Sequence, residues 1–285
     1  MPWNDALIPI AKNYLAVERA VYECAYAGCE TIWIIGNRET TPILRHRIGD
    51  WVNDPTINPL TLQGLNLPYQ RYKQIPIYYV PIHPKDKDIR MSQAHSILYG
   101  YRRIKQIMGS FSRWSTPGKY YVCFPHGVFT PNILQKHRPL ISSKQSIFLQ
   151  SPQGQTIKDG VPLSFTFDSN EYWALRRAFL DNESLLWNGT WNHDRWKFEG
   201  NHLKYEDQYT GRFIKVETLV QNITIPPESI IPLKWFYDIS SWDKYCEFLA
   251  SKWAKTTRRP NGFLKYHEFS KVGVDLEEEN LDDES

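Results

Sequence analysis

The sequence predicts an α/β protein, because amphipathic helices and β-prone runs alternate along its first 124 residues. Residues 6–36 hold a short loop, a helix, a tight Ala-Gly-Cys turn and a strand. In the helix, apolar residues recur near helical spacing from Leu15 to Ala25, and residues 31–35 form an unbroken β-prone run. This order predicts a mostly parallel sheet flanked by helices, with right-handed crossovers between its strands.

The same alternation continues downstream. A short helix is expected at 42–52, a second buried strand at 75–82, a long helix at 92–108 and a third strand at 119–124. A loop rich in Pro and Asn separates the first two of these, at 53–74. Ligands of parallel sheets usually bind at the carboxyl ends of the strands, which here are residues 36–38, 83–90 and 125–127.

The second half of the chain has a different character. Residues 146–168 predict a β-hairpin around Gly154, with a second turn at Asp159 and Gly160. Helices are expected at 170–180 and 242–253. Residues 186–210 are rich in Trp, Asn and His without a clear period, which predicts an irregular insertion. We expect one catalytic domain over 1–274, followed by a disordered acidic tail at 275–285.

Charge is unevenly distributed along the chain. The net charge is +3, but the tail carries seven of the 31 acidic residues and no Lys or Arg. The remainder therefore has 34 basic residues against 24 acidic ones, an excess of ten. Such an excess favours a polyanionic partner, and the tail could compete for the same surface. A solubilising tail on an ordinary basic protein is the simpler alternative.

The four cysteines, at positions 24, 29, 123 and 246, lack metal-ligand spacing and predict reduced thiols. Cys24 and Cys29 are five residues apart, which favours different faces of one helix. Neither a membrane-length apolar stretch nor a signal pattern occurs, so a cytoplasmic protein that does not enter the membrane is expected.

The sequence of residues 6–36, in which ALIPIA is followed by YAGCETIWIIG, resembles a segment of sugar-1-phosphate nucleotidyltransferases and their GT-A relatives. In those proteins the loop and helix after the first strand shape a nucleotide-sugar pocket. The resemblance covers about residues 6–130 and 230–250. It implies a GT-A-like fold and an enzyme that handles a nucleotide-activated sugar, and it implies Asn37 and Arg38 as ligand-binding residues at the end of the first strand.

Two further motifs match the family by position. Ser92-Gln93-Ala94-His95-Ser96 resembles the turn that contacts the nucleotide base, and Ser92 also suits a helix N-cap. In the loop before it, Asp86 and Asp88 have the spacing of carboxylates that share a Mg²⁺ or Mn²⁺ ion on a diphosphate. Arg90, Arg38 and Lys87 could neutralise the phosphates. A capped helix beside a solvated charged loop is the structural alternative.

Two strand ends supply the candidate catalytic residues. Trp235 to Trp242 resembles the family turn in which an acid lies beside the phosphates, which makes Asp238 a candidate catalytic and metal-binding residue. Where the family has an acid after its third strand, this chain has Phe-Pro-His-Gly, so His126 is a candidate base, metal ligand or phosphate donor. Alternatively, Asp238 caps the last helix and His126 is satisfied by backbone.

This sequence starts just downstream of the expected place of the family's Gly-rich loop, which cradles a triphosphate, so the loop either precedes these residues or is absent. If it is absent, condensation of a triphosphate with a sugar phosphate is not expected. A glycosyltransferase that binds a UDP-sugar depends less on that loop than a nucleotidyltransferase does. We therefore expect transfer of a sugar from a UDP-sugar to a hydroxyl, with Asp238, Asp168 or Glu171 as the base.

The acceptor is inferred from the net charge of the chain and from an overall resemblance of its sequence. The basic body fits DNA, and the chain resembles short bacteriophage proteins that include transferases acting on 5-hydroxymethylcytosine in DNA. The alternatives are a sugar-1-phosphate nucleotidyltransferase and a degenerate relative that binds nucleic acid or a protein.

Overall fold

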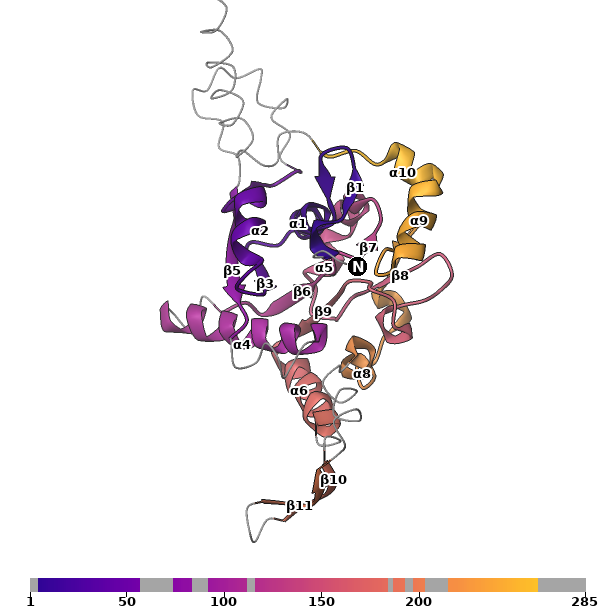
Figure 1. Ribbon diagram of the computed structural model, residues 1–285. Coiled ribbons are helices and arrows are strands. Elements are labelled where there is room, and N and C mark those ends of the chain that lie inside the picture. The colour runs from indigo at the N-terminus through magenta and orange to yellow at the C-terminus, as the bar shows by residue number, and fades with distance from the viewer. Residues whose placement is uncertain are drawn as a thin grey trace, which may run out of the picture.

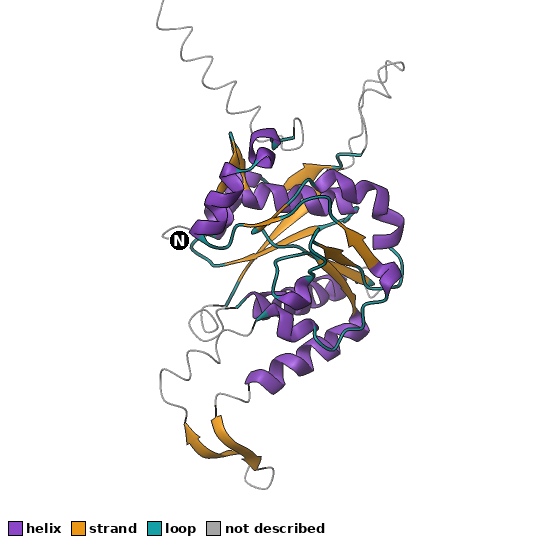
Figure 2. Ribbon diagram, turned by 90° about the vertical axis from the view of Figure 1, so that its right-hand side faces the viewer, coloured by secondary structure: helices purple, strands orange, loops and turns teal. Residues whose placement is uncertain are grey.

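A computed structural model describes residues 5–56, 74–83, 92–111, 116–183, 187–192, 197–202 and 215–260. The molecule is a mixed α/β protein in which helices lie on both sides of a group of central strands (Figure 2). The predicted acidic tail lies outside the described residues, as does most of the predicted loop at 53–74.

The first half follows the expected order of elements (Figure 1). Its strands are β1 (Pro9–Ala11), β2 (Tyr14–Leu15), β3 (Ile32–Gly36), β4 (Trp51–Asn53), β5 (Gln74–Pro81) and β6 (Lys119–Val122). Its helices are α1 (Ala16–Ala27), α2 (Thr41–Ile48) and α4 (Gln93–Phe111), after a short 3₁₀ turn at Asp5–Leu7. Helix α2 stops earlier than predicted because Gly49, with φ of 86°, turns the chain into β4.

The second half contains shorter elements. Its strands are β7 (Gly127–Val128), β8 (Phe148–Gln150), β9 (Phe165–Asp168), β12 (Ile230–Pro232) and β13 (Tyr237–Asp238). Its helices are α5 (Arg138–Ile141), α6 (Ser169–Glu183), α8 (Val216–Val220), α9 (Trp242–Ala250) and α10 (Lys252–Thr256), with 3₁₀ turns at Pro131–His137, Ile157–Asp159 and Pro227–Ser229. The single helix predicted at 242–253 is two helices, because the hydroxyl of Ser251 caps α10 through the amide of Ala254.

The first two strands predicted from the sequence pair in parallel, as expected. Strand β3 pairs with β5 in parallel register, with Trp33 opposite Tyr78. Strand β12 is parallel to β8, whereas β4 is antiparallel to β5. The expectation of a mostly parallel sheet is wrong for the described strands, since β6 and β8 both pair antiparallel with β9. The segment predicted as a hairpin around Gly154 does contain two antiparallel strands, β8 and β9, but they pair only at Phe148 and Phe165 and are separated by residues 151–164 rather than by a tight turn.

The predicted irregular insertion contains regular structure. Strands β10 (Trp187–Asn192) and β11 (Lys197–His202) pair antiparallel and extend beyond the end of α6 (Figure 1). The prediction of irregular structure is therefore wrong for these two strands. The two strands, with the sequences WNGTWN and KFEGNH, contain too few apolar residues to give the apolar-polar alternation by which strands are found in a sequence.

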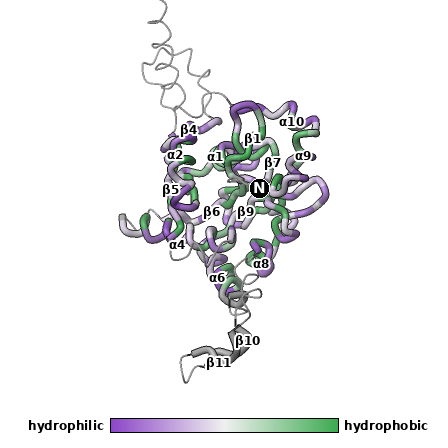
Figure 3. The backbone as a smooth tube through the Cα atoms, in the orientation of Figure 1, coloured by the Kyte–Doolittle hydropathy of each residue, from purple (hydrophilic) through white to green (hydrophobic). Residues whose placement is uncertain are grey.

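Helix α1 is buried almost all round, which places it at the centre of the fold. It packs against β3, β4 and β5 on one side and against α9 on another, while α4, α6 and α8 form a second core with β6 and β9. Figure 3 shows hydrophobic segments gathered in the interior around α1 and β7. Consecutive residues of β6 divide between the two cores, with Tyr120 facing α4 and Tyr121 facing α1.

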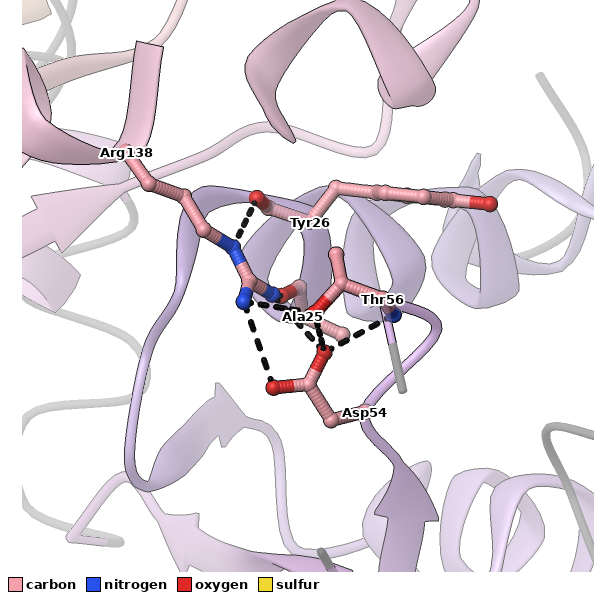
Figure 4. Close-up of polar contacts among 5 residues, drawn as sticks. All are labelled: Ala25, Tyr26, Asp54, Thr56 and Arg138. Atoms are coloured by element: carbon pink, nitrogen blue, oxygen red, sulfur yellow. Dashed lines mark hydrogen bonds and ion pairs between the residues drawn. The ribbon is translucent and has the colours of Figure 1, made fainter. Parts of the chain in front are cut away.

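Arg138 joins the end of α1 to the chain after β4 (Figure 4). Its guanidinium donates to the carbonyl oxygens of Ala25 and Tyr26 and pairs with Asp54 at 2.8 Å. Burial opposes ionisation of Asp54, but hydrogen bonds from Arg138 and Thr56 outweigh it and lower the pKa of the carboxyl. One side chain thus caps a helix and fixes a loop.

The cysteines are all free, as predicted, but their placement differs from the prediction. The sulfur of Cys24 lies 3.3 Å from that of Cys123, and Cys24 also interacts with Cys29. Gly28 adopts a left-handed conformation that ends α1 and folds Cys29 back, so that its amide donates to the Cys24 carbonyl. Hydrogen bonds with Cys123 and Cys29, together with burial, raise the pKa of the Cys24 thiol.

Candidate functional site

The pairing of β7 with β13 brings the two candidate catalytic segments together. Asp238 is the register partner of Gly127, and the amide of Ile239 donates to the carbonyl oxygen of His126 at 2.9 Å. Residues about 110 positions apart in the sequence therefore lie on adjacent strands. We call His126, Asp238 and Lys244 the β7–β13 site.

Gly127 makes this approach possible. A Cβ atom at this position would clash with the backbone carbonyl oxygen of Pro162 and lie 3.1 Å from the ring of Phe236. Only glycine permits so close a contact, because neither the carbonyl nor the packed ring is the free end of a flexible side chain. The glycine of the Phe-Pro-His-Gly motif is thus required by packing around His126.

Asp238 uses both carboxylate oxygens. Its Oδ1 accepts the amide of Ser240 at 2.9 Å, and its Oδ2 forms an ion pair with Lys244. The Asp238 side chain is 15% exposed and Lys244 is 51% exposed. Helix α9 is capped by Ser241, whose hydroxyl accepts the amide of Lys244. The carboxylate therefore stabilises the turn before α9 while remaining reachable from solvent together with its lysine.

Arg19 supports the other strand of the site from within the core. Its guanidinium donates to the carbonyl oxygen of Phe124 at 2.7 Å and lies 5.1 Å from the ring centre of Phe129. Glu23 binds the same guanidinium at 2.6 Å, and both side chains are fully buried. Arg19 thus holds residues on both sides of His126. The sequence analysis did not identify Arg19 or Lys244 as site residues. For Arg19, its spacing of four residues from Glu23 in a helix could have indicated an ion pair.

The end of β3 lies beside the end of β5, as predicted for parallel neighbours. The amide of Ile82 donates to the carbonyl oxygen of Gly36 at 2.9 Å. Asn37 and Arg38 follow, and both are exposed. The carbonyl oxygen of Asn37 accepts the amides of Thr40 and Thr41, which organises the turn into α2. The side chain of Arg38 is available to an anion at this edge.

Ser92 and His95 both serve the start of α4. The Ser92 hydroxyl accepts the amide of His95 at 3.1 Å, which confirms the predicted N-cap. His95 is 6% exposed, and its ring lies between those of Tyr99 and Phe179, at centroid distances of 5.8 and 6.0 Å. The imidazole therefore packs between α4 and α6.

Asp168 caps α6. Its Oδ1 accepts the amides of Asn170 and Glu171, both at 2.8 Å, and Glu171 accepts the amide of Asp168 in return. Lys119 is the register partner of Asp168, and burial lowers the pKa of its amine. Asp168 lies at the end of β9, which runs opposite to β6, so the structure does not bring it together with His126 at the end of β6.

The remaining candidates, Asp86, Asp88 and Arg90, lie outside the described residues, together with Lys87. Within the described ranges, no group of three or more His, Cys, Asp or Glu side chains could hold a metal ion. Asp238, whose oxygens bind Ser240 and Lys244, does not fit a divalent cation in this arrangement, since an ammonium group occupies the position that the cation would need.

No family model and no curated protein matches this chain. Among the helices of the described residues, none combines the length and apolar character needed to cross a membrane. The geometry of the β7–β13 site and the sequence motifs are therefore the basis of any functional assignment.

Proposed function

We propose that this protein is a glycosyltransferase that uses a UDP-sugar and has its reacting groups at the β7–β13 site. The observation that carries the proposal is the pairing of Asp238 with Gly127, the residue that directly follows His126, so that the acid and the histidine of two separate motifs lie near each other along the chain paths. The GT-A-like fold, the nucleotide-sugar donor and any Mg²⁺ or Mn²⁺ ion held by Asp86 and Asp88 belong to this proposal. The order of motifs supports it.

In the proposed reaction, the acceptor hydroxyl attacks the anomeric carbon of the sugar. A bond forms between the acceptor oxygen and that carbon, and the bond from the carbon to the diphosphate oxygen breaks. The proton of the hydroxyl passes to Asp238, and the negative charge gathers on the departing diphosphate. The ammonium group of Lys244, which is held beside Asp238, would stabilise that charge, and His126 would donate an imidazole N–H to the phosphates.

The ion pair with Lys244 gives the site a chemically reasonable resting state. An arriving diphosphate carries more negative charge than one carboxylate, so it competes for the lysine. Once the lysine turns to the phosphates, Oδ2 of Asp238 becomes free to accept a proton. Asp168 remains in the proposal only as the cap of α6, because both its oxygens serve that helix start.

The proposed acceptor is 5-hydroxymethylcytosine in DNA. The test incubates the protein with a panel of UDP-sugars and duplex DNA containing either cytosine or 5-hydroxymethylcytosine. Mass spectrometry of the digested nucleosides then looks for an added hexose. We expect a hexose on the hydroxymethyl base only, and a loss of at least 100-fold in rate for Asp238→Asn. The matched control is Asp243→Asn, which removes an exposed acid from the first turn of α9, five residues further along the chain.

A second function is favoured by one observation. Because both oxygens of Asp238 already bind protein groups, the carboxylate is also suited to a purely structural role. A binding protein without catalytic activity would then bind DNA or a UDP-sugar but add no mass to any nucleoside. That result, together with no product from UTP and a sugar phosphate, would reject the transferase.

A further inference from the structure

Helices α4 and α6 together present a group of exposed cations and one exposed indole. We call this group, which consists of Arg102, Lys105, Trp173, Arg176 and Arg177, the α4–α6 surface. Arg102 and Lys105 are three residues apart on α4, so they project from the same side of the helix. Trp173 and Arg176 have the same spacing on α6. The two helices pack against each other, as Figure 1 also shows.

The junction between the helices places their cations close together. The rings of Tyr101 in α4 and Tyr172 in α6 stack with centroids 3.8 Å apart. Burial raises the pKa of the Tyr172 hydroxyl, while the positive charges of Arg176 and Arg102 both act on it in the opposite direction. Positive charges from both helices therefore act on one phenol at their junction.

These cations differ from several other arginines of the described chain in lacking acidic partners. Arg45, Arg47, Arg138 and Arg259 each pair with a carboxylate. Within the described part of the chain, no ion pair is formed by Arg102, Lys105, Arg176 or Arg177, and α4 itself contains no Asp or Glu. Their charge is therefore directed at solvent and available to an anion.

Trp173 adds an aromatic face to the same surface. Its side chain is 58% exposed, the highest value among the large hydrophobic residues of the described chain. The guanidinium of Arg176 lies 5.7 Å from the indole ring centre, so the cation and the ring occupy one place on α6. A rigid, exposed indole among unpaired cations suits a ligand that carries both phosphates and flat bases.

We propose that the α4–α6 surface binds single-stranded DNA, with the cations on its phosphates and Trp173 stacked on an unpaired base. The choice of DNA rather than RNA rests on the acceptor proposed above. Arg102 lies ten residues along α4 from Ser92, or about 15 Å at 1.5 Å per residue. The surface is therefore separate from the start of α4 and would hold the polymer rather than the reacting nucleotide.

The test measures fluorescence anisotropy of a labelled 20-nucleotide single strand at several salt concentrations. We expect the double variant Arg102→Glu with Arg176→Glu to bind at least tenfold more weakly. Loss of two phosphate contacts should also reduce the salt slope by about 1.4, since each contributes about 0.7 on a single strand. Trp173→Ala should lower affinity at least fivefold without changing the slope, because stacking is uncharged.

The matched control is Lys136→Glu with Lys144→Glu, which reverses two exposed cations elsewhere on the surface. Equal weakening by the control would overturn the proposal, because it would show a general effect of net charge. Tighter binding of duplex DNA, of RNA with the same sequence or of polyglutamate would also overturn it. If the wild-type protein bound the single strand at this surface but transferred no sugar, only the proposed transferase activity would be rejected, and the binding surface would stand.

Discussion

Gly127 is the residue whose substitution most directly tests the packing of the β7–β13 site. Gly127→Ala places a methyl group against the Pro162 carbonyl and the Phe236 ring, and overpacking of this kind costs about 1–3 kcal/mol. We expect a lower midpoint in urea unfolding. Gly109→Ala is the control, since open space surrounds Gly109 in α4 and alanine should stabilise the helix by up to about 1 kcal/mol. Equal stability of the two variants would contradict this account.

The lowered pKa of Asp54 leads us to expect that the free energy of unfolding depends on pH. Its pKa is lowered in the folded protein, so its contribution is complete above the unfolded value of about 3.9 and disappears as the pH falls through the folded pKa. Asp54→Asn should therefore cost about 1.5–3 kcal/mol at pH 7, the range for hydrogen bonds to a charged group, and progressively less below pH 4. Urea unfolding at pH 3, 4, 5 and 7 measures this difference.

The exposed pair of Arg45 and Asp50 supplies the control for that experiment. Its two side chains are 62% and 56% exposed, so solvent screens the interaction. Asp50→Asn should change the free energy of unfolding by less than about 1 kcal/mol at every pH. If both substitutions had the same effect at pH 7, the contacts of Asp54 with Arg138 and Thr56 would not be the source of its stabilisation.

Between elements, the buried pair of Arg19 and Glu23 links α1 to the strands beside it. Glu23 accepts the hydroxyls of Tyr121 and Ser164, while Arg19 binds Phe124. Removing one charge leaves the other buried without compensation, which costs about 3–5 kcal/mol. We expect Arg19→Met to lower thermal stability strongly. The double variant with Glu23→Gln should recover part of the loss, and a double variant less stable than Arg19→Met would contradict the coupling.

Local sequence pattern was sufficient for most elements of the first half. Helix α1, strand β3 and helix α4 lie close to their predicted positions because their apolar periodicity is long and regular. The antiparallel return of β9 to β6 was missed, because it depends on contacts between residues about 45 positions apart. For the site, motifs indicated His126 and Asp238, but two-residue strands carry no pattern from which their pairing could be predicted.

At the scale of the whole molecule, the two surfaces proposed above to be functional occupy different parts of one fold. The β7–β13 site lies where the chain after β6 meets the chain before α9, and its cation is paired with an acid. The α4–α6 surface lies on the helices of the second core, and its cations are unpaired within the described residues. A paired lysine suits a ligand that must displace it, whereas unpaired cations suit a polymer bound through many weak contacts.

The uneven charge of the chain leads to a final prediction about affinity for DNA. Removal of residues 275–285 takes away seven acids and raises the net charge from +3 to +10. We expect the shortened protein to bind single-stranded DNA more tightly at low salt, with the gain declining as the Debye length falls from about 30 Å at 0.01 M to about 8 Å at 0.15 M. A full-length variant with the seven acids changed to Asn or Gln separates charge from length. It should behave like the shortened protein, because the expected effect is electrostatic. If only the shortened protein bound more tightly, the tail would act through its bulk, and charge competition for the basic body would be rejected.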